Sequence, residues 1–152
     1  MPISYCILKA LPLYYAHWDG CILAGDVEQN FERYRSDGDF RRGMPELIDL
    51  RHVTDLQFET SFVQILVSKF RVQRVPKSGM TKTVILTGDA LTYGRARQFQ
   101  THASMRGGID VHITRSEFDA LHEHGLPYGG IAQMLARHAP EWTPNDCIME
   151  AC

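Results

Sequence analysis

The sequence lacks three features that would assign it to a specialised class of protein. Its 152 residues include 16 basic and 18 acidic side chains, so the formal net charge of -2 gives no general attraction to nucleic acid or anionic lipid. No apolar run approaches the ~18 residues that a membrane-spanning helix needs. The cysteines form no Cys-x-x-Cys pair. These absences favour an ordinary globular chain with no membrane span and no nucleic-acid partner.

The first 18 residues are rich in apolar side chains but lack the pattern of an export signal. Lys9 lies inside the apolar part, and Pro2 and Pro12 interrupt it. The cysteines are too few for the disulfide framework of a small secreted domain: Cys6, Cys21, Cys147 and Cys152. We therefore expect a soluble, cytoplasmic protein with reduced thiols.

Recognisable catalytic motifs are also missing. The sequence contains no His-Glu-x-x-His zinc pattern, no Gly-x-Ser-x-Gly elbow and no phosphate-binding loop. Among its seven histidines, His122 and His124 are two residues apart, a spacing that puts them on different faces of a helix. We expect no metal, no cofactor and no catalytic residue.

Local patterns predict an α/β chain. Residues 3–10 and 13–18 have the β-branched and aromatic composition of strands, and Asp19-Gly20 has the composition of a tight turn. A helix with an apolar stripe follows, and strands then alternate with helices. The later predicted strands are 47–51, 83–87 and 109–114, and the later predicted helices are 58–70, 89–106, 116–122 and 131–138.

This order predicts a mixed β-sheet with helical crossovers in a single domain. We place the domain at residues 1–127. The C-terminal helix and tail, residues 128–152, either pack on this domain or extend from it toward a second copy of the chain, which leaves a homodimer open. Asp89 and Ser116 are the expected N-caps of their helices.

Three stretches resemble the SpoIIAA-like (STAS-like) domain family, which contains many uncharacterised bacterial proteins. Residues 47–53 contain a Leu-x-Asp-Leu strand, and 83–100 contain a Val-Ile-Leu strand followed by a Tyr-Gly-x-Ala-Arg-x-Phe helix. Residues 109–121 supply a last strand and a short helix, so the resemblance spans residues 1 to 123. It implies a SpoIIAA-like fold and a role in binding rather than catalysis.

The anti-sigma factor antagonists of this family carry a phosphorylated Ser in an Asp-Ser-Ser-Gly motif. The resemblance places that Ser near Phe58 or Glu59 of this chain, with Thr60 and Ser61 displaced by a residue or more. Glu59 has the position of a first-turn acid that matches the helix dipole. We therefore expect no kinase-controlled switch of the antagonist type.

Together, these patterns select the candidate interaction or ligand residues: Asp49, Phe58, Glu59, Thr60, Tyr93 and Phe99. Asp49 lies in a predicted interior strand, where a carboxylate more often bonds a backbone group or a neighbouring helix than performs chemistry. Tyr14 and Trp18, together with Tyr93 and Phe99, could line an apolar cleft, although core packing is the commoner role of such aromatics. One basic stretch is interpreted as a solvated rim: Lys69, Arg71, Arg74, Lys77 and Lys82.

Two functional hypotheses from different classes follow. The leading one is a non-catalytic interaction or regulatory module with a protein partner. The alternative is a carrier of an apolar small molecule or lipid, because SpoIIAA-like folds look similar to the lipid-binding CRAL-TRIO architecture. An enzyme ranks third, since the spacings of a nucleophile, base or metal set are missing.

Overall fold

The computed structural model describes residues 1–77 and 79–144. One mixed sheet contains five strands: β1 (Ile3–Leu8), β2 (Leu13–Leu23), β3 (Glu46–Gln57), β4 (Thr81–Leu86) and β5 (Ile109–Thr114). The helices are α1 (Ala24–Arg35), α2 (Thr60–Arg74), α3 (Ala90–Arg106), α4 (Glu117–Glu123) and α5 (Ile131–His138). The predicted α/β class with helical crossovers is thus confirmed.

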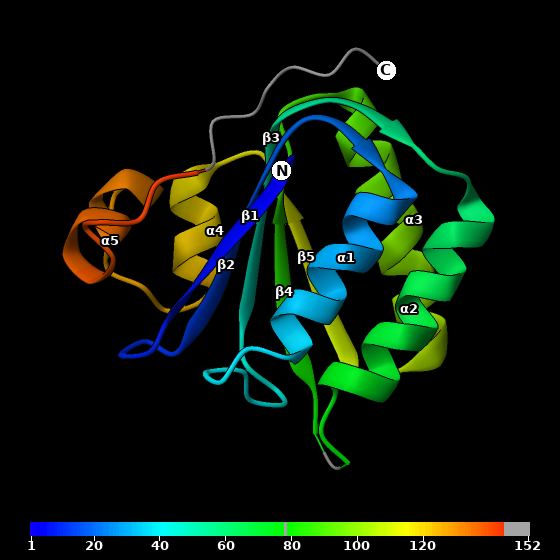
Figure 1. The fold of residues 1–152 in the computed structure, drawn as a ribbon, viewed down its shortest axis with the longest axis horizontal. Helices are drawn as coiled ribbons and strands as arrows, with labels where there is room; N and C mark the ends of the chain where they lie inside the picture. The colour runs from blue at the N-terminus through cyan, green and yellow to red at the C-terminus, as the bar shows by residue number, and fades with distance from the viewer. Residues whose placement is uncertain (78, 145–152) are drawn as a thin grey trace.

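The strands lie in the order β1-β2-β3-β4-β5, with β1 antiparallel to β2 and all other neighbours parallel. Because the chain advances one strand at a time in one direction, crossovers of a single hand put α1, α2 and α3 on the same face. Helices α4 and α5 cover the opposite face (Figure 1). The sheet is therefore the middle layer of three.

Strand alternation divides the buried side chains between the two faces. On β3, Ile48 and Leu50 pack toward α1–α3, whereas Leu47 packs toward α4 and α5. The first core includes Ile22, Phe31, Val67, Phe70 and Ile85, and the second includes Val84, Leu86, Leu121, Ile131 and Met134.

The two helix caps are confirmed, but the predicted Asp19-Gly20 turn is wrong. Asp89 Oδ1 accepts a hydrogen bond from Thr92 N at 2.9 Å, and Ser116 Oγ accepts one from Asp119 N at 3.2 Å. Strand β2 continues through Asp19 to Leu23, with irregular pairing on either side of Asp19-Gly20. Gly20 has a φ of +74°, which suits a bulge inside a strand as well as a turn.

The C-terminal helix packs on the domain through Ile131 and Met134, and the Trp142 Nε1 atom donates to the Tyr5 carbonyl at 3.0 Å. Cys6 is free, but Cys21 is disulfide-bonded, so the expectation of reduced thiols is wrong at Cys21. Cys147 and Cys152 lie outside the described residues. Of the helices in the described ranges, none has the length and apolar character needed to cross a membrane.

Candidate ligand cavity

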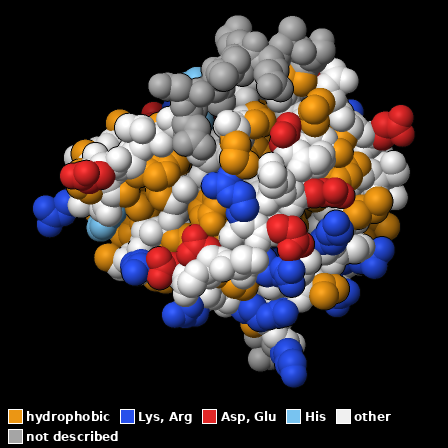
Figure 2. All heavy atoms as spheres, viewed as in Figure 1, with side chains coloured by type: hydrophobic (Ala, Val, Ile, Leu, Met, Phe, Trp, Pro, Cys, Tyr) orange, Lys and Arg blue, Asp and Glu red, His pale blue; other side chains and the backbone are white. Residues whose placement is uncertain are grey.

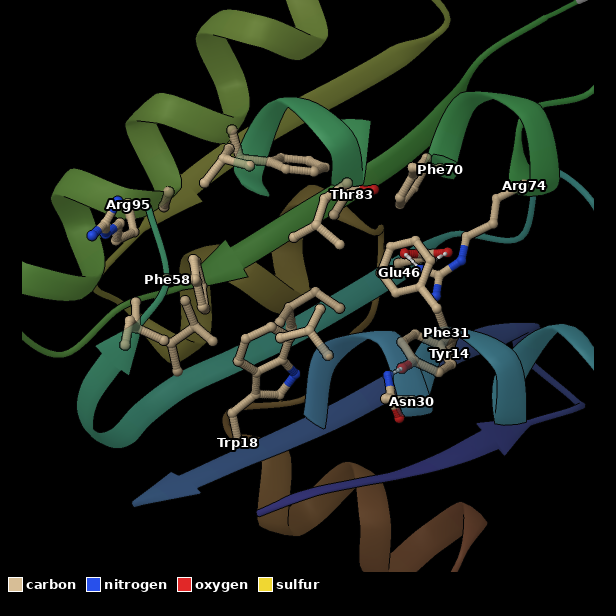
Figure 3. A pocket seen from close by; sticks show the side chains of 18 residues that line it. Tyr14, Trp18, Asn30, Phe31, Glu46, Phe58, Phe70, Arg74, Thr83 and Arg95 are labelled. Carbon is tan, nitrogen blue, oxygen red and sulfur yellow. Dashed lines mark hydrogen bonds and ion pairs between the residues drawn. The ribbon is translucent and has the colours of Figure 1, made fainter. Parts of the chain in front are cut away.

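A largely apolar cavity lies between the sheet and helices α1, α2 and α3 (Figure 3). Its volume is about 90 Å³, whereas a cavity that holds one water molecule needs roughly 10–15 Å³. Apolar side chains from all three helices and from the sheet line it, among them Val27, Leu50, Leu66 and Phe99.

The mouth of the cavity is formed by its partly exposed lining residues. Trp18 comes from β2, Phe58 from the loop between β3 and α2, and Arg95 and Phe99 from α3. The Arg95 guanidinium lies 5.6 Å from the centroid of the Phe58 ring. This end of the cavity is apolar, with a single cation beside it.

The closed end contains a buried ion pair. Arg74 Nη1 donates to Glu46 Oε1 at 3.1 Å, and the two residues are only 3 % and 1 % exposed. Glu46 begins β3 and Arg74 ends α2, so the pair joins the sheet to a helix. Burial raises the pKa of Glu46, and the charge of Arg74 opposes that rise.

Aromatic rings enclose the Arg74 guanidinium. Its central carbon lies 3.9 Å from the ring centroid of Phe31, 4.5 Å from that of Tyr34 and 5.0 Å from that of Phe70. A guanidinium is weakly hydrated and stacks well on aromatic faces, which is why Arg tolerates this setting better than Lys would.

Several polar atoms of the lining are buried without a hydrogen-bond partner among the described residues: Trp18 Nε1, Asn30 Oδ1, Arg74 Nε, Arg74 Nη2 and Thr83 Oγ1. A buried polar group without a partner costs about 1–3 kcal/mol. Such groups are rare in folded proteins, and their concentration in one cavity therefore calls for a physical explanation.

A second polar cluster lies on the opposite face of the sheet. Arg51 donates to Asp49 through Nε at 3.0 Å and through Nη2 at 2.9 Å, and the Tyr15 hydroxyl donates to Asp49 Oδ2 at 2.9 Å. Burial would raise the pKa of Asp49, but the hydrogen bonds and charge of Arg51 hold it below its usual value. Arg51 also lies 3.4 Å from Glu117, whose Oε1 accepts from Ile131 N at 2.6 Å.

This cluster includes a potential metal-binding group that the sequence patterns did not reveal. The ligand atoms of His17, Asp49 and His52 lie within 4.8 Å of one another. Each Asp49 oxygen, however, already accepts two hydrogen bonds, three of the four from Arg51. A cation would have to displace Arg51, so we interpret the cluster as a structural link from β3 to α4 and α5.

The structure separates the six predicted site residues. Phe58 and Phe99 line the cavity, as do Tyr14 and Trp18, whereas Asp49 points to the other face of the sheet. Tyr93 is 41 % exposed on α3 and lies outside the lining.

Glu59 is the N-cap residue of α2, one position before the first turn in which we expected it, and it makes no side-chain cap hydrogen bond. Thr60 and Ser61 are exposed in the first turn of that helix. None of these three residues lines the cavity.

Arg74 is the main residue that the sequence patterns misplaced, because it stands in a basic stretch interpreted as a solvated rim. The spacing of Val67, Phe70 and Arg74 puts it on the buried face of α2, and this was the available signal.

Comparisons with known proteins support the fold. No protein-family model matches the chain, and no curated protein matches it. A solved structure that is similar is an uncharacterized protein of the DUF3478 family with a SpoIIAA-like fold, from Shewanella loihica PV-4. The two share 16 % sequence identity with a TM-score of 0.51, over 80 % of this chain and 92 % of that one. The chain therefore has the SpoIIAA-like fold, as its sequence predicts.

Proposed function

We propose that this chain is a non-catalytic binding module whose cavity takes an apolar small molecule carrying a polar group. The observation that supports this most is the set of unpartnered polar atoms, from four lining residues, around an otherwise apolar space. Small-molecule sites are typically concave and mostly apolar, with a few polar groups that fix the orientation of the ligand. This proposal develops the carrier hypothesis from the sequence.

The charged groups of the cavity support binding rather than catalysis. Glu46 and Arg74 are paired with each other, and Arg95 is partnered by Gln98 at 3.1 Å. A general acid or base must be able to exchange its proton with a bound substrate. Glu46 instead serves as the counterion of Arg74, which suits a site that holds a molecule unchanged.

A dye-binding titration tests the proposal. The fluorescence of the neutral dye N-phenylnaphthylamine should rise when the dye enters the apolar cavity of the purified protein. Ala96, buried in the lining, is replaced by Phe to fill the cavity, and A96F should abolish most of the rise. The matched control is A132F, the same substitution at an exposed position of α5.

The control should bind the dye as the wild type does. If the wild type gives no rise, or if A96F folds and still binds the dye fully, then the cavity does not bind apolar molecules.

A second candidate function, docking of an acidic protein, is favoured by a basic hollow between the ends of α2 and α3. Arg42, Arg71, Lys77 and Arg106 line it together with Val72, which is 72 % exposed. Figure 2 shows Lys and Arg side chains gathered toward the end of the molecule where α2 leads into β4. This arrangement supports the interaction-module hypothesis.

Polyglutamate is a suitable model partner for the hollow. It should bind at low salt, and the double variant R71E/R106E should lose that binding because two attractive charges become repulsive. Equal binding by both proteins would remove this candidate.

A further inference from the structure

One edge of the Arg74 guanidinium has no partner in the described part of the chain. Its Nη1 atom bonds Glu46, but Nε and Nη2 are both buried and unpaired. These two atoms are neighbours on the planar group, and their N–H bonds point in parallel. The edge is therefore preorganised for a planar group with two acceptor oxygens.

Arg51 of the same molecule shows what the Nε and Nη2 edge of an arginine binds when an acceptor is present. Its Nε and Nη2 atoms donate to the two oxygens of Asp49 at 3.0 and 2.9 Å. The pair has the side-by-side geometry that makes Arg selective for carboxylates. Arg74 belongs to the cavity lining, and the same two atoms are buried in it without a partner among the described residues.

We infer that the ligand of the cavity is a monocarboxylate with an apolar chain, its carboxylate on the Nε and Nη2 edge of Arg74. The inference rests on the proposed binding function and specifies the ligand class. The chain of the ligand lies along Leu50 and Phe99 toward the mouth beside Phe58.

A further polar group, the Thr83 hydroxyl, accompanies Arg74 at the closed end. Thr83 is paired with Glu46 across β3 and β4, so its hydroxyl lies on the strand beside the ion pair, buried and without a partner in the part of the chain that the structure describes. It offers another donor to a bound oxygen.

The charges at this end favour a single carboxylate over a phosphate. Glu46 already balances the charge of Arg74, and the other cation of the lining, Arg95, lies at the mouth. A carboxylate adds one negative charge beside the Arg74–Glu46 pair and a phosphate adds up to two, so the phosphate leaves the larger uncompensated charge in a buried space, which costs more.

Replacement of Glu46 provides a specific test for a bound carboxylate. Glu46 and the ligand share one guanidinium, so their negative charges repel each other. Replacing Glu46 with Gln removes that repulsion and should strengthen the binding of a carboxylate. A neutral alcohol of the same chain length should be unaffected.

The experiment is displacement of N-phenylnaphthylamine by decanoate and by decanol. In the wild type, decanoate should bind about tenfold or more tightly than decanol, the expected size of charge-assisted hydrogen bonds. E46Q should increase the preference for decanoate over decanol. R74K should decrease this preference, because an ammonium lacks the planar edge of a guanidinium. R97M, at an exposed position of α3 that lines neither the cavity nor the basic hollow, should leave the ratio unchanged.

The outcomes distinguish a failure of the proposed binding function from a failure of the carboxylate inference. Failure of the dye to bind the wild type overturns the binding function itself. Dye binding with equal displacement by decanoate and decanol overturns the carboxylate inference and leaves the binding function intact. An unchanged ratio in E46Q also overturns it, and this readout does not depend on any variant of Arg74 being folded.

Discussion

Arg74 and Glu46 form an ion pair with an Nη1–Oε1 distance of 3.1 Å, although 28 residues separate them in the sequence and both are almost fully buried. Taking two charges out of water is expensive, and the attraction within a buried pair often only offsets that cost. The presence of this ion pair is therefore weak evidence that it stabilises the fold. Its position at the closed end of a cavity supports a role in binding, because two nitrogens of Arg74 have no partner among the described residues.

Breaking the pair should nevertheless destabilise the fold. Replacing Arg74 with Met leaves Glu46 as a buried charge without its partner, and we expect a loss of about 3–5 kcal/mol in the free energy of unfolding. Urea denaturation measures this loss.

The double variant E46L/R74M should recover a large part of that stability, because no charge then remains buried. Equal stability of R74M and the wild type would show that Glu46 is solvated or neutral in the folded protein.

Local sequence patterns predicted most of the fold because they depend on neighbouring residues. The alternation of Ile109, Val111 and Ile113 predicted β5, and Asp89 marked the start of α3. The extent of β2 was missed because Asp19-Gly20 is typical of a turn, whereas here β2 stays paired with β3 through these residues and Gly20 accommodates a bulge.

The site was less predictable because its polar groups come from distant segments. Only the pairing of β3 with β4 brings Glu46 beside Thr83, and only the packing of α2 brings Arg74 to them. His17 lies opposite Asp49 through the register of β2 and β3, which no spacing in the sequence reveals. The aromatic residues Trp18 and Phe99 were considered for a cleft, but nothing local distinguishes a lining aromatic from a core one.

The acid stability of the protein should depend on Asp49. Its pKa is lowered in the folded state, so its contribution is complete above the unfolded value of about 3.9 and is lost as the pH falls through the lower folded value. D49N should therefore be less stable than the wild type near neutral pH. The two free energies of unfolding should converge as the pH falls below about 4.

Urea denaturation at a series of pH values provides the measurement. A stability difference between D49N and the wild type that stays constant across this acid range would contradict the assigned role of Arg51 as its charge partner.

Gly88 and Gly94 should respond in opposite ways to replacement by Ala. A Cβ at Gly88 would lie 3.1 Å from the backbone of Arg51, whereas a Cβ at Gly94 meets nothing within 4 Å. G88A should therefore destabilise the protein by displacing β3, and G94A should stabilise helix α3 by up to about 1 kcal/mol.

Thermal denaturation of the two variants, each compared with the wild type, gives the result. A G88A protein as stable as the wild type would show that the loop after β4 can move away from Arg51 at no cost.

The most direct test of the binding account uses the two tryptophan indole N–H signals in a ¹H–¹⁵N spectrum. Trp18 Nε1 is buried at the cavity without a partner in the described residues, whereas Trp142 Nε1 is held by the Tyr5 carbonyl. Adding decanoate should shift the Trp18 signal, assigned by its loss in W18F, and leave the Trp142 signal in place. If neither signal moves at saturating decanoate, or if only that of Trp142 moves, then the cavity is not the binding site.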